Sequence, residues 1–223
     1  MIESGKLENP EPTHGRRHHV THYNLAALYQ NIGDAAAAEA HLRRSLQLSP
    51  DNPEAHTNLA VLIAGKGRFA EAATHLQIAI DLDPLLQQAR TNLGYMLIKL
   101  DRLDTAVAVL KGALEMDPSD AKALYNLGIA YTVGDEREKG ADCFEALLFQ
   151  HPRAVLPRLF LAQVRLEMGR KNAARQTLEL LADLLSPEEL SESIEALRHS
   201  GPLETVPNEP LLRPFLRPLI EGN

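Results

Sequence analysis

The chain has 223 residues, of which 44% are hydrophobic and 4% aromatic, and its formal net charge is −7. Because Lys and Arg are scattered rather than clustered, the composition argues against nucleic-acid binding, and the single cysteine, Cys143, excludes a disulfide framework within the chain and any multi-cysteine metal site. No apolar run approaches the roughly 18 residues that a membrane span needs, so we expect no direct membrane insertion and a cytoplasmic protein, whether free or held at a membrane complex by a partner.

The most informative feature of the sequence is a period of 34 residues. A leucine returns at this spacing, at Leu25, Leu59, Leu93, Leu127 and Leu161. The residue after it is always small: Ala26, Ala60, Gly94, Gly128 and Ala162. A proline closes four units, at Pro50, Pro84, Pro118 and Pro152, and the fifth unit closes one residue late, at Pro187. A fixed period of this length indicates stacked helical hairpins, each of which needs its neighbours to bury its apolar face.

Each unit predicts two helices, because apolar positions recur at three- and four-residue spacing with one interruption by Gly or Asp. The first helices are expected near 19–32, 53–66, 87–100, 121–133 and 155–168. The second helices are expected near 35–48, 69–82, 103–116, 137–150 and 171–184. The interruptions are Gly33-Asp34, Gly67, Asp101, Gly134-Asp135 and Gly169.

The repeated pattern resembles the tetratricopeptide repeat (TPR), whose consensus places Leu, Gly or Ala, Tyr, Gly, Ala and Pro at these offsets. The stretches YNLAALYQNIGDAAAAEAHLRRSLQLSPDN and YNLGIAYTVGDEREKGADCFEALLFQHP carry it most clearly. Two residues depart from it: Asp101 stands where a turn glycine is usual, and Arg165 stands where a large apolar residue is usual. The resemblance implies an all-α, right-handed α-solenoid of five TPR hairpins.

The expected organisation is a flexible N-terminal segment (1–18), five repeats over 19–186 (19–52, 53–86, 87–120, 121–154 and 155–186), a capping helix (187–200) and a Pro-rich apolar tail (201–223). Ser186-Pro187-Glu188-Glu189 predicts a capping box at the start of the capping helix. In the tail, prolines recur every four residues with apolar pairs between them, which forbids a long regular helix. Two hypotheses stay open: the tail packs on the last repeat, or it docks onto another protein. In the first, Phe215 and Leu219 of the tail would contact Leu156, Leu159 and Phe160.

In the TPR family the first helices line a concave groove, and the resemblance assigns one inward position of each unit to a row of amides. These residues are Asn24, Asn58, Asn92 and Asn126, followed by Phe160 in the fifth unit. A carboxamide offers the donors and the acceptor that complement a peptide unit. The row therefore resembles the asparagine ladder that holds an extended peptide by its backbone. The alternative hypothesis is that neighbouring helices or water satisfy these amides and that no ligand binds.

Other side chains are expected beside the amides. The aromatic ones are Tyr23, Tyr95 and Tyr125, which supply apolar contact with a polar tip. Lys99 and Lys122 would favour a mildly acidic ligand. The resemblance does not extend to the carboxylate clamp that grips chaperone tails, because only Asn92 and Lys122 match its five positions.

Histidines invite a metal hypothesis, which the sequence does not support. His22 and His56 are one period apart, as are His41 and His75, and duplication of a repeat alone produces this spacing. Without a cysteine or carboxylate at matched spacing, we expect no metal and no cofactor. Because the sequence also contains no phosphate-binding loop and no nucleophile paired with a base, we do not expect an enzyme.

The sequence therefore predicts a non-enzymatic protein–protein interaction scaffold, an adaptor or assembly factor that holds an extended peptide or helix of a partner in the concave groove. The alternative is a constitutive accessory subunit of a stable complex, with no free peptide ligand. The expected partners are other proteins, bound through the groove and, in the second hypothesis for the tail, through the tail as well. The open ends of such an array leave homo-oligomerisation open.

Overall fold

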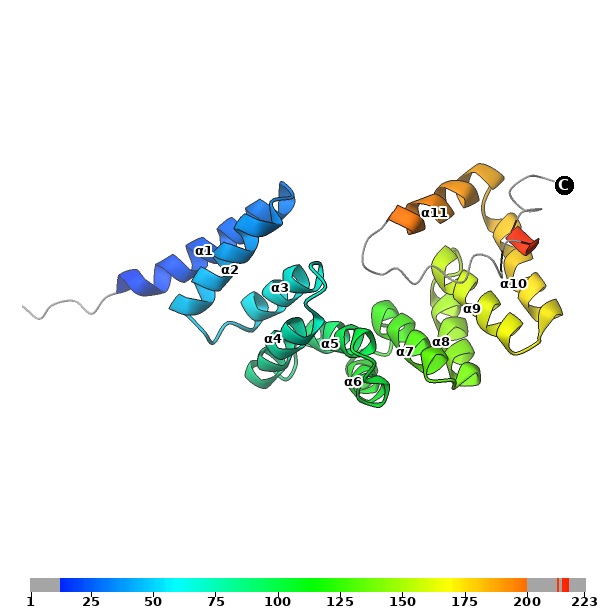
Figure 1. Cartoon of the computed structure of the whole chain (residues 1–223), viewed down its shortest axis with the longest axis horizontal. Helices are drawn as coiled ribbons and strands as arrows, with labels where there is room; N and C mark the ends of the chain where they lie inside the picture. Colours follow the sequence, from blue (N-terminus) through cyan, green and yellow to red (C-terminus); the bar gives the residue numbers. More distant parts are fainter. Residues whose placement is uncertain (1–12, 200–211, 213, 217–223) are drawn as a thin grey trace, which may run out of the picture.

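The protein is described by a computed structural model, which covers residues 13–199, 212 and 214–216. Within these residues the chain forms ten helices in five antiparallel hairpins, followed by an eleventh helix (Figure 1). The hairpins are α1 (Thr13–Asn31) with α2 (Ala35–Leu48), α3 (Pro53–Ala64) with α4 (Phe69–Leu82), α5 (Gln87–Lys99) with α6 (Leu103–Met116), α7 (Ala121–Val133) with α8 (Arg137–Gln150), and α9 (Val155–Glu167) with α10 (Lys171–Leu184). The eleventh helix is α11 (Pro187–His199), and the described tail residues 212 and 214–216 are helical as well. The predicted all-α solenoid of five hairpins is confirmed.

The second helices begin and end where the 34-residue period predicts. The first helices agree within two residues, except that α1 begins at Thr13, six residues before its expected start. Residues 13–18 of the expected N-terminal segment are therefore helical and belong to α1. The reason is local: the stretch from Thr13 to Val20 contains no proline and a single glycine, so nothing in it ends the helix earlier.

One residue in every hairpin turn has a left-handed backbone, and the five residues are 34 positions apart. They are Gly33, Gly67 and Gly169, with φ between 74° and 82°, and Asp101 and Asp135, with φ of 57° and 66°. Asp tolerates this conformation better than most residues because its short side chain can form local hydrogen bonds. The departure of Asp101 from the repeat pattern therefore leaves the turn unchanged.

The two helices of each hairpin pack closely because the small residue of the first helix lets the second helix approach. A Cβ atom at Gly94 would lie 2.4 Å from the Leu110 side chain, and one at Gly128 would lie 2.8 Å from the Phe144 ring. Leu110 and Phe144 are both fully buried. Each second helix then packs on the first helix of the next hairpin, so that the core runs continuously along the stack.

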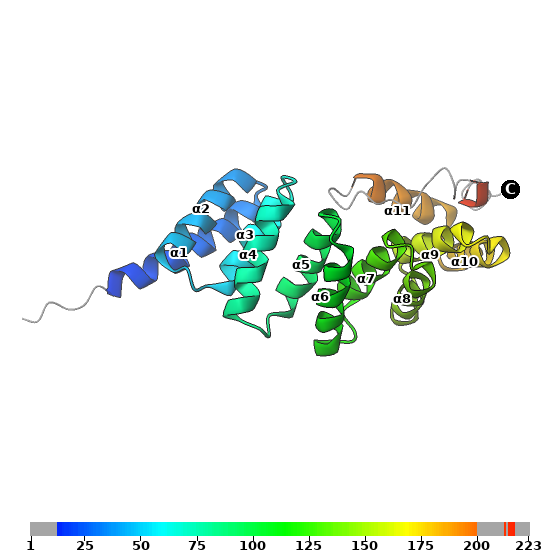
Figure 2. The same ribbon diagram turned by 60° about the horizontal axis from the view of Figure 1, so that its bottom comes forward.

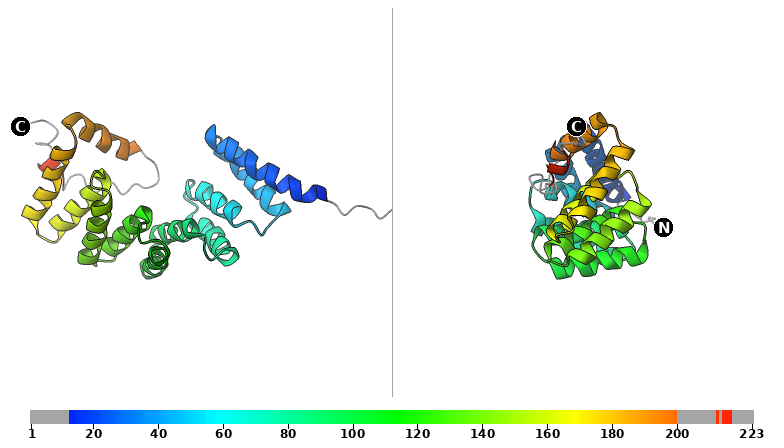
Figure 3. Two further views of the ribbon diagram at one scale, coloured as in Figure 1. Left: turned by 180° about the vertical axis from the view of Figure 1, so that it is seen from behind. Right: turned by 90° about the vertical axis from the view of Figure 1, so that its right-hand side faces the viewer.

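The stack is an open arc. In Figure 1 the hairpin of α1 and α2 rises at one end and α11 rises at the other, on the same side of the arc. Helices α3 and α5 lie toward the inside of this arc, and α4 and α6 lie toward its outside, as Figure 1 and the view from behind in Figure 3 both show. Figure 2 shows successive hairpins side by side along the long axis. We call the inward side of the first helices the inner face.

The first two repeats meet at an ion-pair network. The Glu39 carboxylate on α2 is buried and forms ion pairs with Arg43 of its own helix and with Lys66 and Arg68 in the turn between α3 and α4. Arg43 and Arg68 also contact Glu71. A hydrogen bond from Lys66, followed by one from Arg43, holds the pKa of Glu39 at about 2, because the cations stabilise its ionised form.

The predicted capping box is present at the start of α11. The Ser186 amide donates to the Glu189 carboxylate over 2.7 Å, and the Glu189 amide donates to the Ser186 hydroxyl over 3.2 Å. This reciprocal pair satisfies two donors that a helix start leaves free. Leu190 of α11 is buried against α9 and α10, so the helix covers the end of the stack.

Tail residues pack in the same apolar cluster. Leu212 and Leu216 are buried together with Leu159 of α9, and Phe215 lies at the edge of this cluster. Leu156 and Phe160, the other predicted contact residues on α9, pack with Ile129 and Phe144 in the neighbouring cluster. The remaining predicted contact residue, Leu219, lies outside the described residues.

Candidate partner-binding surface

The amide row lies on the inner helices, but its four members differ in accessibility. Asn24 is exposed, whereas Asn58 and Asn92 are partly buried. Asn58 donates from Nδ2 to the Tyr23 hydroxyl of the preceding repeat over 3.0 Å. The Nδ2 atom of Asn92 is buried and has no hydrogen-bond partner among the described residues. The amides of the first three repeats therefore range from open, through paired across repeats, to unsatisfied.

In the fourth repeat the amide of the row is buried. Asn126 is only 8% exposed. Beside it, the Tyr125 ring packs edge-on against Phe160 and tilted against Phe144, with centroid distances of 5.7 and 6.1 Å. Phe160, at the equivalent position of the fifth repeat, stacks on Phe144 at 5.6 Å. Asn126 is therefore the one buried amide of the row, and the neighbouring Tyr125 ring already packs against two phenylalanines.

Near Asn92, an aromatic and cationic group occupies the third repeat. The Lys99 ammonium lies 5.9 Å from the Tyr95 ring centroid and 5.8 Å from that of Phe69. A cation over two rings is held in place electrostatically while its remaining N–H groups stay available. Lys122, the other predicted cation, is exposed at the start of α7. The structure thus brings Tyr95 and Lys99 together and leaves Lys122 apart from them, in the next repeat.

A polar junction ties the third repeat to the fourth. The Asp120 carboxylate caps α7 by accepting hydrogen bonds from the amides of Lys122 and Ala123. Its second oxygen accepts from the Thr91 hydroxyl over 2.7 Å and from the Gln87 side chain over 3.0 Å. Thr91 and Gln87, both on α5, are therefore engaged in holding neighbouring repeats together.

The repeated histidines form pairs inside hairpins. The Nδ1 atoms of His22 and His41 are 2.8 Å apart, and those of His56 and His75 are 2.9 Å apart. Since one ring must accept the hydrogen bond, both members of a pair cannot be protonated together. Burial, and then the neighbouring His56, lower the pKa of His75. Over the part of the chain that the structure describes, no three His, Cys, Asp or Glu side chains gather as metal ligands would.

Cys143 is the thiol on α8, and it lies partly buried beside Leu110 and Tyr131. Burial raises the pKa of this thiol to about 11. Since the thiolate is the reactive form, the environment disfavours nucleophilic chemistry at Cys143.

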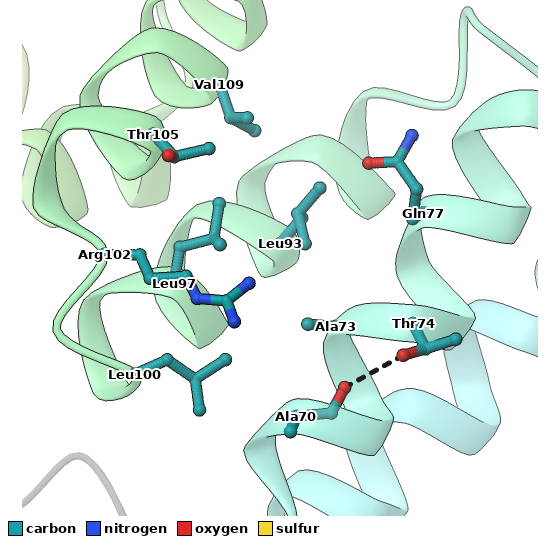
Figure 4. A pocket seen from close by; sticks show the side chains of 10 residues that line it. All are labelled: Ala70, Ala73, Thr74, Gln77, Leu93, Leu97, Leu100, Arg102, Thr105 and Val109. Carbon is teal, nitrogen blue, oxygen red and sulfur yellow. Dashed lines mark hydrogen bonds between the residues drawn. The ribbon is translucent and has the colours of Figure 1, made fainter.

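A second kind of surface, which the sequence did not predict, lies between hairpins away from the inner face. Figure 4 shows a pocket of about 410 Å³ in which Thr74 and Gln77 of α4 face Leu93 and Leu97 of α5, with Val109 of α6 beyond them. A similar pocket of about 420 Å³ lies two repeats later, between α8, α9 and α10. We call these two sites the α4–α6 pocket and the α8–α10 pocket.

None of the described helices is both long enough and apolar enough to cross a lipid bilayer.

Comparison with known proteins agrees with the fold. The family described as tetratricopeptide repeat matches residues 23–86, and the family described as TPR repeat matches residues 94–132. No curated protein shows significant sequence similarity to the chain.

Several solved structures share the architecture. MamA 41-end from Desulfovibrio magneticus RS-1 superimposes with a TM-score of 0.70 at 21% identity, over 78% of this chain and 96% of that one. PilF of Pseudomonas aeruginosa gives 0.68 at 20% identity, over 94% and 90% of the two chains. YrrB, described as a TPR protein with an unusual peptide-binding site, gives 0.63 at 18% identity, over 75% and 87%. At these identities the likeness concerns the fold. The 34-residue period, the five stacked hairpins and the two family matches together make this chain a tetratricopeptide repeat protein.

Proposed function

We propose that this protein is a non-enzymatic protein-interaction scaffold, an adaptor or assembly factor that holds an extended segment of a partner protein along the inner face of its first three repeats. The observation that carries the proposal is the Asn92 carboxamide, whose Nδ2 donor has no partner among the described residues. A buried donor without an acceptor destabilises the free protein by about 1–3 kcal/mol. A half-turn about χ2 would bring this donor outward, where the backbone carbonyl of a ligand would satisfy it.

The neighbouring residues suit a peptide ligand. Asn58 stands one repeat before Asn92 and Asn24 stands two repeats before it, and both remain at least partly accessible. The Lys99 ammonium near Tyr95 favours a segment with a carboxylate or a carbonyl at that point. YrrB, which shares the fold, is described as having a peptide-binding site. The proposed surface does not include Asn126, which is buried, or Tyr125, whose ring packs against Phe160.

The test compares partner capture from native lysate by the wild type and by the Asn58→Ala/Asn92→Ala double variant. At about 1 kcal/mol per lost hydrogen bond, the double variant is expected to bind the partner about 10- to 30-fold more weakly. Asn172→Ala on α10 is the matched control, since it makes the same change at an exposed position of a second helix. Equal capture by the double variant and the wild type would rule out the amides as the binding device.

Two further comparisons separate the alternatives. Tyr23→Phe removes the acceptor of the Asn58 hydrogen bond and leaves the Asn58 amide in place. It therefore reports how much of the loss of partner binding comes from the junction between repeats. Salt washes distinguish an adaptor from a permanent subunit. An adaptor held by a few polar contacts is expected to release its partner, whereas a constitutive subunit stays in fixed stoichiometry with it.

A further inference from the structure

Three residues that line the α8–α10 pocket stand out, and two of them, Phe149 and Arg165, are residue types that the other repeats lack at these positions. They are Phe149 at the end of α8, Arg158 near the start of α9, and Arg165 near the end of α9. Arg158 and Arg165 are seven residues apart and so share one face of α9, which is opposite the face of Leu156 and Phe160. The pocket therefore lies away from the inner face and is separate from the amide row.

Phe149 is the most exposed of the large apolar side chains in the described residues, at 89%. At the same position, the other four repeats carry Gln47, Asp81, Glu115 and Asp183, all of them exposed. An apolar ring at a position that is otherwise polar gains nothing for the stack, because no side chain covers it. Leu180, on the opposite wall of the pocket, is also about half exposed. Together these two residues form an uncovered apolar surface at the rim of the pocket.

Arg158 is a buried cation that pairs with no carboxylate of the described residues. The residue is only 6% exposed, and Nη2 donates to the Pro152 carbonyl. Among the same residues, its Nε atom has no hydrogen-bond partner. Burial lowers the pKa of Arg158, and no neighbouring charge opposes this effect. A buried charge in this state is costly unless an anion joins it.

The equivalent arginine two repeats earlier shows what is unusual about Arg158. Arg90 also binds the carbonyl of the preceding proline, Pro84, and it does so through both Nη2 and Nε, at 2.8 and 3.3 Å. Both arginines therefore hold the loop before their own helix in place by a hydrogen bond to its proline carbonyl. Unlike Arg90, Arg158 keeps one donor unused and lies deeper in the protein.

Arg165, the other cation of the pocket, already has a carboxylate partner. Its guanidinium pairs with Glu145 across the pocket and donates to the Thr177 hydroxyl. The charges of Arg165 and Glu145 thus cancel, and the lining of the pocket carries one net positive charge, that of Arg158.

We propose that the α8–α10 pocket binds a segment of a protein partner that carries a carboxylate next to a bulky apolar side chain. The carboxylate would accept hydrogen bonds from the Arg158 guanidinium, and the apolar side chain would cover Phe149 and Leu180. Such a ligand matches the pocket in both respects, since charge-assisted hydrogen bonds to arginine are strong when water is excluded from them. The α4–α6 pocket has Leu97 in place of Arg165 and no buried cation in its lining, so it offers an internal comparison.

The experiment uses the isotopically labelled full chain and two probes, N-acetyl-Leu-Phe with a free carboxylate and the same dipeptide as its C-terminal amide. Binding is followed by amide chemical shifts in the NMR spectrum. The free acid is expected to shift resonances of α8, α9 and α10 and to saturate in the millimolar range, with the amide binding at least about tenfold more weakly. Arg158→Gln is expected to reduce the affinity for the acid to that for the amide.

Two variants keep the test decisive. Phe149→Gln changes an exposed side chain to a residue that the first repeat carries at this position, so folding is preserved and both probes are expected to bind several-fold more weakly. Leu85→Gln removes an apolar side chain of similar exposure outside the pocket and is expected to change nothing. Equal affinity for acid and amide, equal shifts in the α4–α6 pocket, or no shifts at about 20 mM probe would each overturn the proposal, even if Arg158→Gln fails to fold.

Discussion

Replacing Glu39 by Gln should weaken the junction between the first and second repeats and lower the stability of the protein. The size of the loss should depend on pH. Glu39 is 4% exposed, and three cations surround it. Its pKa falls from 4.5 to about 2 in the folded protein, which at about 1.4 kcal/mol per pKa unit corresponds to about 3 kcal/mol of stabilisation. A carboxylate whose folded pKa is depressed contributes this stability fully above pH 4.5 and loses it as the pH falls toward 2.

Urea unfolding followed by circular dichroism at pH 7, 4 and 3 measures the effect. At pH 7 the Glu39→Gln variant should be less stable than the wild type by about 3 kcal/mol, and the gap should fall to about half by pH 3. Glu71→Gln is the control: its carboxylate is more exposed than that of Glu39, so the loss should stay below about 1 kcal/mol. A gap that does not change between pH 7 and pH 3 would show that charge is not what Glu39 contributes.

Three further predictions concern single residues. Gly128→Ala should destabilise the protein by about 1–3 kcal/mol in the same assay, because its Cβ would meet the buried Phe144 ring, whereas Gly112→Ala, with nothing within 4 Å, should stabilise α6 by about 0.5–1 kcal/mol; loss of stability in both would contradict the packing argument. Asp101→Gly should raise the thermal midpoint slightly, since φ is 57° there. Cys143, with its pKa of about 11, should react with a thiol reagent at pH 8 far more slowly than it does in urea.

The fold was predictable because it rests on a repeated local pattern. Each hairpin uses the same turn position, the same small residue and the same closing proline, so an error in one unit is corrected by the other four. Asp101 shows this well: read alone it lacks the glycine that marks the turn elsewhere, but the period places the turn correctly, and its positive φ agrees. The early start of α1 escaped prediction because it precedes the first unit and therefore has no counterpart.

The binding surface was less predictable, since a period says which face a residue occupies but not what covers it. Asn24 and Asn126 hold the same position, yet one is exposed and the other buried. The surroundings differ as well, since Phe144 and Phe160 replace the leucine and the asparagine of earlier repeats and both pack against Tyr125. For the α8–α10 pocket the sequence did contain a usable signal: Arg165 and Phe149 are residue types that the other repeats lack at these positions. What the sequence could not reveal is that all three meet in one pocket.

The junctions between repeats share one backbone arrangement but are held by different kinds of side-chain contact. These differences determine where each proposed site can lie. The first junction is ionic at Glu39, the third is a polar network at Asp120, and the fourth is a stack of Phe144 on Phe160. In a linear array each junction acts mainly on its neighbours. The amides of the row differ along the array: those of the first three repeats are exposed or partly buried, and that of the fourth repeat is buried. The aromatic junction lies between the fourth and fifth repeats. On the other face of α9, the Arg158 side chain is a buried charge. Because the two sites occupy different repeats and opposite faces, Asn92→Ala should leave dipeptide binding unchanged, and Phe149→Gln should leave capture at the inner face unchanged.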